Sequence, residues 1–366
     1  MKKIFVDIYL SFNLGDDLFL HILSERYPNS EITVNYVGRN YDKFISKYKN
    51  ITRRKYTVFN KIFQKLGLKD YLTDYESLSK EYDALIFVGG SIFREEDYHQ
   101  SLYKDRMKMV TEFIKMNKPV FIMGSNFGPY KTDEFFYEYR DFYKLCKDVC
   151  FRDLYSYNLF KDLKNVRYAP DIVFQMDVKK YKKNNKKDVV GYSIIDVTHK
   201  KGLYQYNEKY IESIVKSIEL VVSKGYDCLL MSFCESEGDL RAINNIKRKL
   251  SKETLNKVNI YEYKGNLDEA INLISKLKLF VAARFHANII GLLCQVGILP
   301  VIYSDKTTNM LKDINLNQIL VHMENLDSLY DNDIIENALN NKADLCEISK
   351  EAKNQFKKLD EFEKLM

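Results

Sequence analysis

The sequence contains LKLFVAARFHANIIGLL at residues 277–293, an apolar run that leads without a break into a helix-like run. Residues 279–283 predict a buried strand, and the pattern from Ala287 onward predicts a helix. Arg284, Phe285 and His286 form the junction between the two. A strand that ends in Arg-Phe-His and turns directly into a helix places a permanent cation and a titratable imidazole at the edge of a sheet.

A second junction of this kind lies earlier in the chain, where the apolar residues 149–151 end in Arg152 and Asp153. The planar guanidinium of arginine stays charged and matches carboxylate and phosphate groups. Two cationic strand ends in the two halves of one chain predict a cleft that binds a small, multiply charged anion.

Apolar strand-like runs alternate with amphipathic helix-like runs along the chain. The first half predicts strands at 4–10, 32–37, 84–88, 119–123 and 149–151, and helices at 18–27, 98–116, 135–146 and 155–163. After the polar stretch 179–187, strands are predicted at 189–194, 226–233, 258–263, 279–283 and 299–303, and helices at 210–222, 240–250 and 267–277. Apolar strands between helices are typical of a parallel sheet covered on both faces. The sequence therefore predicts an α/β fold of two Rossmann-like domains facing a cleft.

The length of 366 residues exceeds what one hydrophobic core usually serves, and 46% of the residues are hydrophobic. We expect domains at 1–178 and 188–325, followed by C-terminal helices at 326–366 that pack back on the first domain. The tail carries apolar residues at helical spacing, namely Ile348, Ala352, Phe356, Leu359, Phe362 and Leu365.

Charge and cysteine content exclude several classes of protein. The formal charge of +6 is modest, and the densest basic run, 179–183, is interpreted as a solvated linker, with a nucleic-acid or lipid patch as the alternative. No nucleic-acid partner is expected. The six cysteines lack paired metal spacing, which predicts no metal site, mostly buried thiols and a reducing compartment. No segment approaches the roughly 20 apolar residues of a membrane span.

Small and polar residues collect where predicted strands end, which is where open α/β sheets bind ligands. Gly15 permits a tight turn. Asp16 and Asp17 either cap the next helix and add charge to its first turn, or one of them binds a ligand hydroxyl. Two turns offer backbone N–H groups to oxyanions, Gly89-Gly90-Ser91 and Gly124-Ser125-Asn126, although both also fit ordinary βα connections.

The charged candidates each have a structural alternative. Arg152 binds an anion, or it forms a salt bridge with Asp153 or with Asp171, which follows a short strand. His286 is a candidate general acid or base, since an unperturbed imidazole has a pKa of about 6.5, or it is a helix cap or core residue. Lys306 adds a cation after the strand at 299–303, or it is a surface lysine.

Taken in order, these segments resemble the polysaccharide pyruvyl transferase family. The matching segments are Asn13-Leu14-Gly15-Asp16, Phe87-Val88-Gly89-Gly90-Ser91, Gly124-Ser125-Asn126-Phe127-Gly128-Pro129, Phe151-Arg152-Asp153-Leu154-Tyr155-Ser156, Ala169-Pro170-Asp171-Ile172, Ala283-Arg284-Phe285-His286-Ala287 and Pro300-Val301-Ile302-Tyr303-Ser304-Asp305-Lys306. The sequence departs from the family pattern at Ser91 and at Ser125-Asn126.

The resemblance implies a GT-B-like fold with an acceptor-side first domain and a donor-side second domain. It also implies phosphoenolpyruvate as donor, a sugar hydroxyl as acceptor and no cofactor. By resemblance, Arg152, Arg284 and His286 match donor-binding positions, and Phe285 supplies a backbone contact. His286 and Asp16 are the expected catalytic residues. The expected substrate-binding residues are Arg152, Arg284, Phe285, Lys306, Asp171, Gly15, Gly89, Gly90, Ser91, Ser125 and Asn126.

The resemblance further implies a bacterial, cytoplasmic enzyme of exopolysaccharide synthesis. Peripheral contact with the inner face of the membrane is a further alternative. Its acceptor is a glycan, either free or lipid-linked. Residues 39–74 are rich in Tyr, Phe, Lys and Arg, which suits sugar stacking or a lipid-linked phosphate, or else an ordinary exposed connection. The alternatives are a glycosyltransferase that uses a nucleotide sugar and an inactive relative, because fold does not determine function.

Overall fold

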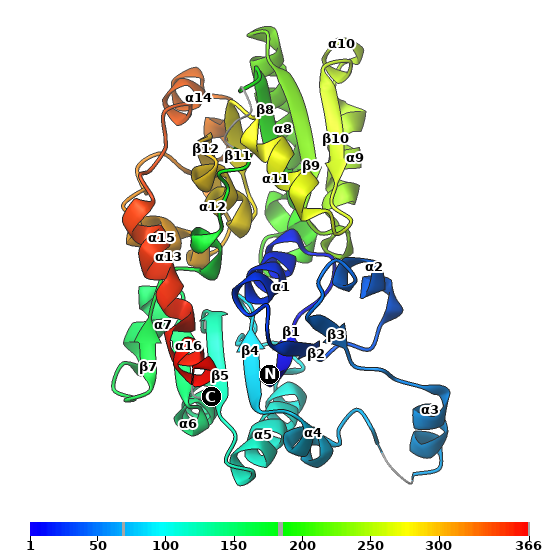
Figure 1. The fold of residues 1–366 in the computed structure, drawn as a ribbon. Coiled ribbons are helices and arrows are strands. Elements are labelled where there is room, and N and C mark those ends of the chain that lie inside the picture. The colour runs from blue at the N-terminus through cyan, green and yellow to red at the C-terminus, as the bar shows by residue number, and fades with distance from the viewer. Residues whose placement is uncertain (68–69, 182–185, 365–366) are drawn as a thin grey trace. The chain divides into compact units, whose positions relative to one another are not determined.

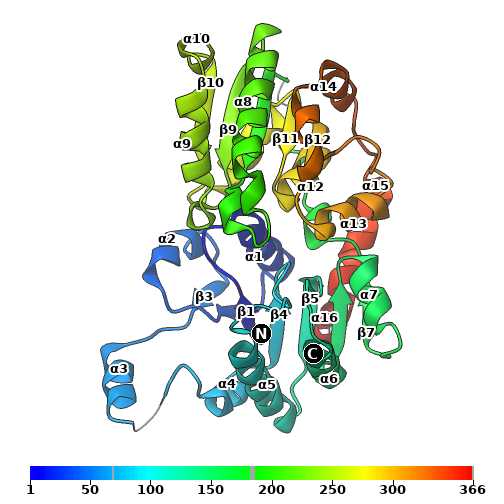
Figure 2. The ribbon, with the colours of Figure 1, turned by 180° about the vertical axis from the view of Figure 1, so that it is seen from behind.

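The computed structural model describes residues 1–67, 70–181 and 186–364 (Figures 1 and 2). The chain divides into two compact units. Unit 1 comprises Met1–Leu10, Phe19–Ile172 and Lys350–Met366, and unit 2 comprises Ser11–Leu18 and Val173–Ser349. This division differs from the predicted domains, because Ser11–Leu18 and residues 326–349 belong to unit 2.

Unit 1 is built on a seven-stranded parallel sheet with the order β3-β2-β1-β4-β5-β6-β7. Its strands are β1 (Lys3–Ile8), β2 (Glu31–Val34), β3 (Ile51–Arg53), β4 (Ala84–Val88), β5 (Val120–Ser125), β6 (Asp148–Phe151) and β7 (Val166–Tyr168). Its helices include α2 (Asp42–Ile45), α3 (Val58–Lys65), α4 (Tyr75–Glu81), α5 (His99–Lys115), α6 (Asp133–Leu145), α7 (Leu154–Phe160) and α16 (Lys357–Glu363). Every residue of the central strand β4 is buried, as expected for a strand without a solvent-facing side.

Unit 2 contains a six-stranded parallel sheet with the order β10-β9-β8-β11-β12-β13. Its strands are β8 (Val189–Ile194), β9 (Asp227–Ser232), β10 (Val258–Glu262), β11 (Leu279–Ala282), β12 (Gly297–Ile302) and β13 (Val321–His322). Its helices include α8 (Asn207–Ser223), α9 (Asp239–Lys249), α10 (Lys252–Leu255), α11 (Leu267–Ser275), α12 (Phe285–Leu293), α13 (Asp305–Asp313) and α14 (Asn332–Ala338). Aliphatic side chains from β8, β11 and α8 dominate its core.

The strand order of each sheet reverses at one point, between β1 and β4 in unit 1 and between β8 and β11 in unit 2. Loops on the two sides of such a point leave the carboxyl ends of the strands in opposite directions, and ligands of open α/β sheets bind there. The candidate residues after β4 and β11 therefore lie where the topology favours a site.

The predicted strands are all present to within a few residues, but β3 and β13 were missed because they span only three and two residues. The predicted helix at 18–27 begins earlier, as α1 (Leu14–Arg26), because the side chain of Asn13 accepts the N–H of Gly15 at 3.1 Å. The prediction of a tight turn at Gly15 with Asp16 as cap is therefore wrong.

The tail forms α15 (Cys346–Ala352), a 3₁₀ turn at Lys353–Phe356 and α16, rather than one continuous helix. Ala352, Phe356 and Leu359 are buried, and α16 belongs to unit 1, where Asp360 accepts hydrogen bonds from Arg26. Leu365 and the part of the basic run at 182–183 lie outside the described residues.

Two further expectations from composition concern thiols and membrane spans. Cys146, Cys150, Cys228, Cys234 and Cys294 are buried, whereas Cys346 is exposed. Within residues 1–67, 70–181 and 186–364, no helix combines the length and apolar character needed to cross a bilayer.

Candidate functional site

In unit 1 the loops after β4, β5, β6 and β7 converge on Arg152. The guanidinium is 5% exposed, and it donates to Asp171 Oδ2 at 2.9 Å and to Asn126 Oδ1 at 2.7 Å. The expected contact with Asp171 is thus present. The other candidate partner, Asp153, caps α7 instead by accepting the N–H of Ser156 at 2.7 Å. The charge of Arg152 is balanced by one buried carboxylate.

The glycine-rich turn after β4 lets Arg152 reach this position. A Cβ atom added to Gly90 would lie 2.6 Å from Nη1 of Arg152, which is closer than carbon and nitrogen can approach. Ser91 donates to Asn126 Oδ1 at 3.1 Å, and Ser125 donates to the carbonyl of Gly89 at 2.7 Å. The predicted residues Gly89, Gly90, Ser91, Ser125 and Asn126 therefore form one packed support around the guanidinium.

The turn after β5 does not offer the free N–H groups that we predicted for it. The N–H of Asn126 donates to the carbonyl of Gly90 at 2.9 Å, and that of Phe127 donates to Ser156 Oγ at 2.8 Å. The N–H of Gly124 donates to Gln355 Oε1 at 2.9 Å. Buried backbone groups must find partners inside the protein, so this turn holds the loops together rather than presenting an anion nest.

Sequence reasoning missed Gln355, which comes from the tail and supports the same edge of the sheet. This side chain is 0% exposed. Its amide nitrogen donates to the carbonyls of Ala169 at 2.6 Å, Pro170 at 3.2 Å and Phe151 at 3.3 Å. The carboxyl ends of β5, β6 and β7 are thus joined by one buried amide. A lone glutamine in an amphipathic tail carries no local signal of this role.

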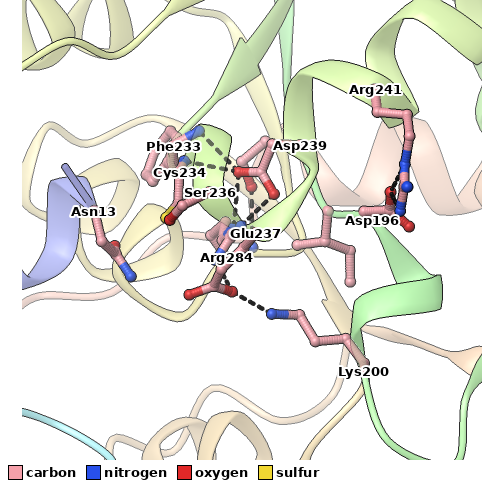
Figure 3. A network of polar contacts seen from close by, with 12 residues as sticks. Asn13, Asp196, Lys200, Phe233, Cys234, Ser236, Glu237, Asp239, Arg241 and Arg284 are labelled. Carbon is pink, nitrogen blue, oxygen red and sulfur yellow. Dashed lines mark hydrogen bonds and ion pairs between the residues drawn. The ribbon is translucent and has the colours of Figure 1, made fainter. Parts of the chain in front are cut away.

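In unit 2 the loops after β8, β9 and β11 meet at Arg284 (Figure 3). This guanidinium is 6% exposed, and it donates to Asp239 Oδ2 at 3.1 Å and to Glu237 Oε2 at 2.8 Å. Asp239 also accepts the N–H groups of Phe233 at 3.0 Å and Cys234 at 2.9 Å. Figure 3 shows Lys200 reaching Glu237 from the loop after β8.

The network contains three charged residues that we did not predict, Lys200, Glu237 and Asp239. A signal for two of them was present, because Glu235-Ser236-Glu237-Gly238-Asp239 follows directly after a predicted strand. Burial opposes ionisation of Glu237, but the positive charges of Arg284 and Lys200 outweigh it and hold the pKa of Glu237 well below its usual range. Glu237 is therefore ionised at neutral pH.

Tyr303, which follows β12, lies between two lysines. The Nζ atoms of Lys200 and Lys306 are 5.7 Å and 5.9 Å from its ring centroid. Burial alone would raise the phenol pKa, but the positive charges of Lys306, Lys200 and Arg284 lower the pKa of Tyr303. Burial and the charge of Glu237 oppose ionisation of this phenol, and the three cations outweigh both.

His286 occupies the first turn of α12, directly after Arg284, and is half-buried, while Phe285 is buried. A Cβ atom added to Gly15 would lie 1.9 Å from Nδ1 of His286. The imidazole therefore fills the space that a side chain at position 15 would take. Glycine is needed here for close approach, and not for the backbone freedom that we predicted.

The segment Ser11–Leu18 is held to unit 2 by its own contacts. The N–H of Leu14 donates to the carbonyl of Phe233 at 3.1 Å, and Asp17 Oδ2 accepts from the Tyr263 hydroxyl at 2.6 Å. Asp17 is fully buried and structural, whereas Asp16 is half-buried. Of the two neighbouring carboxylates, Asp16 is the better placed to meet a ligand.

The sequence-predicted residues thus fall into two groups, one in each unit. Unit 1 gathers Gly89, Gly90, Ser91, Ser125, Asn126, Arg152 and Asp171, and unit 2 contains Gly15, Asp16, Arg284, Phe285, His286 and Lys306. The unit 2 group combines a titratable imidazole with an excess of positive charge. Such a combination can bind an anion and move protons on it.

Several solved structures share the fold of this chain. Anabaena Alr3699/HepE in complex with UDP is 10% identical over 100% of both chains, with a TM-score of 0.61. UDP-GlcNAc 2-epimerase from Neisseria meningitidis bound to UDP-GlcNAc is 12% identical over 99% of both chains, also with a TM-score of 0.61. A glycosyltransferase from Rickettsia africae ESF-5 is 14% identical over 98% of this chain and 93% of that chain, with a TM-score of 0.55. These similarities show a GT-B-like fold of two parallel-sheet α/β domains.

The comparison with protein families is more specific. A family model described as polysaccharide pyruvyl transferase matches residues 13–305, which include every candidate residue named above except Lys306 and Gln355. The chain therefore belongs to the polysaccharide pyruvyl transferase family.

Proposed function

We propose that this protein transfers the pyruvyl group of phosphoenolpyruvate to hydroxyls of a sugar in a cell-surface polysaccharide or its precursor, forming a cyclic ketal. Family membership supports pyruvylation of polysaccharides as the general activity. The observation that carries the finer proposal is the edge of unit 2, where His286 lies two residues after Arg284 and where Lys200 and Lys306 both approach the ring of Tyr303. Phosphoenolpyruvate has a carboxylate and a phosphate of roughly −1.5 to −2 charge, which matches such an edge.

The proposed reaction begins with a proton transfer to the methylene carbon of the donor, which makes its central carbon electrophilic. One sugar hydroxyl then forms an O–C bond to that carbon and gives up its proton. A second hydroxyl attacks the same carbon while the bond to the phosphate oxygen breaks, and its proton balances the departing phosphate. The ketal and inorganic phosphate are the products, with no change in oxidation state.

In this proposal His286 is the group that moves protons, because an imidazole titrates near the pH of catalysis. Lys306 and Lys200 attract the phosphate. Arg284 donates to both Glu237 and Asp239, so its main effect is to order the loops after β9 and β11. Asp16 positions the acceptor hydroxyl.

Arg152 in unit 1 is proposed to contact an anionic group of the donor while Asp171 and Asn126 keep its orientation. A carboxylate and an amide that hold an arginine keep the N–H groups of its guanidinium in a fixed plane. This arrangement favours bidentate recognition of anions. The prediction that this residue binds donor stays a prediction.

The direct test is incubation of the purified protein with phosphoenolpyruvate and glycans that carry two neighbouring hydroxyls. A pyruvyl mass gain on the glycan and an equal amount of released phosphate are expected. Phosphate release without a modified glycan would point to hydrolysis, and the absence of both with every glycan would favour an inactive relative.

A nucleotide-sugar glycosyltransferase is the alternative that the shared fold leaves open, since solved proteins with this fold carry UDP or UDP-GlcNAc. Thermal unfolding measured with each ligand distinguishes pyruvyl transfer from glycosyl transfer. A ligand at 100 times its Kd stabilises the folded state by about 2.7 kcal/mol. Stabilisation by phosphoenolpyruvate supports pyruvyl transfer, whereas stabilisation by UDP or UDP-sugars alone contradicts it.

A further inference from the structure

Helix α3 of unit 1 exposes its whole apolar face. None of its residues is buried. The apolar side chains of the helix and of the residue after it are 46% to 73% exposed, namely Val58, Phe59, Ile62, Phe63 and Leu66. Figures 1 and 2 show α3 standing apart from the sheet and the other helices of unit 1. A contiguous apolar patch of this kind marks a surface that contacts something else.

The five apolar side chains share one side of the helix. At 100° per residue they fall within an arc of about 140°. Lys61 and Lys65 border one edge of this arc, and Asn60 and Gln64 lie on the opposite side. Lysine side chains at the edge of an apolar face can keep their ammonium groups in water or on headgroups while their stems pack below.

The helix is specified by local contacts rather than by burial in the core. Thr57 Oγ1 accepts the N–H of Asn60 at 3.3 Å, and Asn60 Oδ1 accepts the N–H of Thr57 at 2.8 Å, which completes a capping box. Isolated helices of this length are marginal in water. A chain that caps such a helix while leaving its apolar face uncovered gains stability when an external surface covers that face.

The surrounding segment has an unusual charge. Residues 43–69 contain nine Lys and Arg and no Asp or Glu. The rest of the chain has 48 basic and 51 acidic side chains, so this segment supplies all of the protein's positive excess. Arg53 pairs with Asp42 and Arg54 is buried, but six lysines of the segment are exposed, namely Lys43, Lys47, Lys49, Lys55, Lys61 and Lys65.

We propose that α3 docks this protein on an anionic lipid bilayer, with its apolar face in the headgroup region and the neighbouring lysines on lipid phosphates. Amphipathic basic helices bind membranes through burial of their apolar face and through attraction of their basic side chains to anionic headgroups. A second copy of α3 would bring two basic segments into contact, which is unfavourable. A nucleic acid would leave the aliphatic side chains without a partner. An anionic bilayer satisfies both the charge and the apolar face.

The test is cosedimentation of the full-length protein with phosphatidylcholine vesicles, with and without phosphatidylglycerol. Binding to the anionic vesicles only, weakening as salt is raised, is expected. Phe59→Glu/Phe63→Glu and Lys61→Glu/Lys65→Glu should each lower the partition at least about tenfold. Leu66→Glu is a milder variant in case the first pair of changes disturbs folding.

Matched controls come from other helices of unit 1. Tyr137→Glu in α6 replaces an aromatic residue that is 61% exposed, and Lys104→Glu/Lys108→Glu in α5 repeats the i, i+4 spacing of Lys61 and Lys65 on exposed lysines. Both controls should bind vesicles as the wild type does.

Three outcomes overturn the proposal. They are absence of binding to anionic vesicles, equal binding by the α3 variants, and a change of oligomeric state on light scattering without a change in vesicle binding. The assay uses neither donor nor acceptor, so its failure is independent of the failure of pyruvyl transfer.

Discussion

The two arginines at strand ends have the same sequence signal but different surroundings. Arg152 donates to the carboxylate of Asp171 and to the amide oxygen of Asn126, so a buried carboxylate faces its charge. Arg284 meets two carboxylates, and one of these, Glu237, also contacts Lys200. The Arg152 edge is thus a closed, charge-balanced support, whereas the Arg284 edge links several ionisable groups. We therefore propose that proton transfer belongs to the second edge.

Each of the two strand edges contains a glycine that makes room for a neighbouring side chain, and the side chains differ. Gly90 gives room to a guanidinium that Asp171 and Asn126 hold in place, while Gly15 gives room to the half-buried imidazole of His286. A methyl group at position 90 must break a buried ion pair. One at position 15 must displace the imidazole of His286.

The strongest test of the comparison is His286→Ala. Loss of a general acid or base lowers turnover by about 10² to 10⁴-fold, so kcat for phosphate release should fall at least about 100-fold. His322→Ala, in β13 of the same unit, is the matched control and should retain activity. Full turnover by His286→Ala would show that the second edge does not move protons.

The glycine pair gives opposite predictions for activity and stability. Gly15→Ala should lower kcat by about 10 to 100-fold with little change in stability, because it displaces the proton-transfer group. Gly90→Ala should cost about 1–3 kcal/mol of unfolding free energy, measured by urea titration, because it disturbs a buried ion pair.

A double variant checks the reason for the effect of Gly15→Ala. If the methyl group acts through His286, then Gly15→Ala/His286→Ala should be no slower than His286→Ala alone. Additive losses would mean that Gly15 acts through another contact.

A substitution of Lys200 distinguishes attraction of the donor phosphate from stabilisation of the ion-pair network. Lys200→Met should raise KM for phosphoenolpyruvate by about tenfold, since one cation near a phosphate contributes at this level, with a smaller change in kcat. Lys224→Met removes a lysine that is also ion-paired, with Glu336 at 2.6 Å in the same unit, and should leave KM unchanged. Equal effects of the two changes would remove Lys200 from donor binding.

The smallest expected effect is the pH dependence of the Glu237 network. The folded-state pKa of Glu237 is depressed, so its contribution to stability is present above its unfolded pKa of about 4.3 and is lost as the pH falls toward the folded value. Glu237→Gln should therefore lower the unfolding free energy by about 1 kcal/mol near neutral pH. The difference between the urea titrations of wild type and variant should begin to shrink below about pH 4 and shrink further as the pH falls. A constant difference at all pH values would mean that Glu237 acts by packing alone.

The sequence by itself was sufficient to predict the alternation of strands and helices. Buried parallel strands are apolar throughout, and helices repeat their apolar residues with the helical period. It was also sufficient to identify the residues at the strand ends, since the βα junctions 149–153 and 282–286 are contiguous in the chain. Family membership followed from the same short segments in their order.

Only the tertiary structure decided which groups surround those residues. Asp239 and Glu237 meet Arg284 from a loop more than forty positions away, and Gln355 reaches the carboxyl ends of β5 to β7 from the tail. Gly15 and His286 are likewise adjacent only in space. Local sequence records the propensity of each segment, but the partner of a buried charge depends on which loops the sheet order brings to one edge.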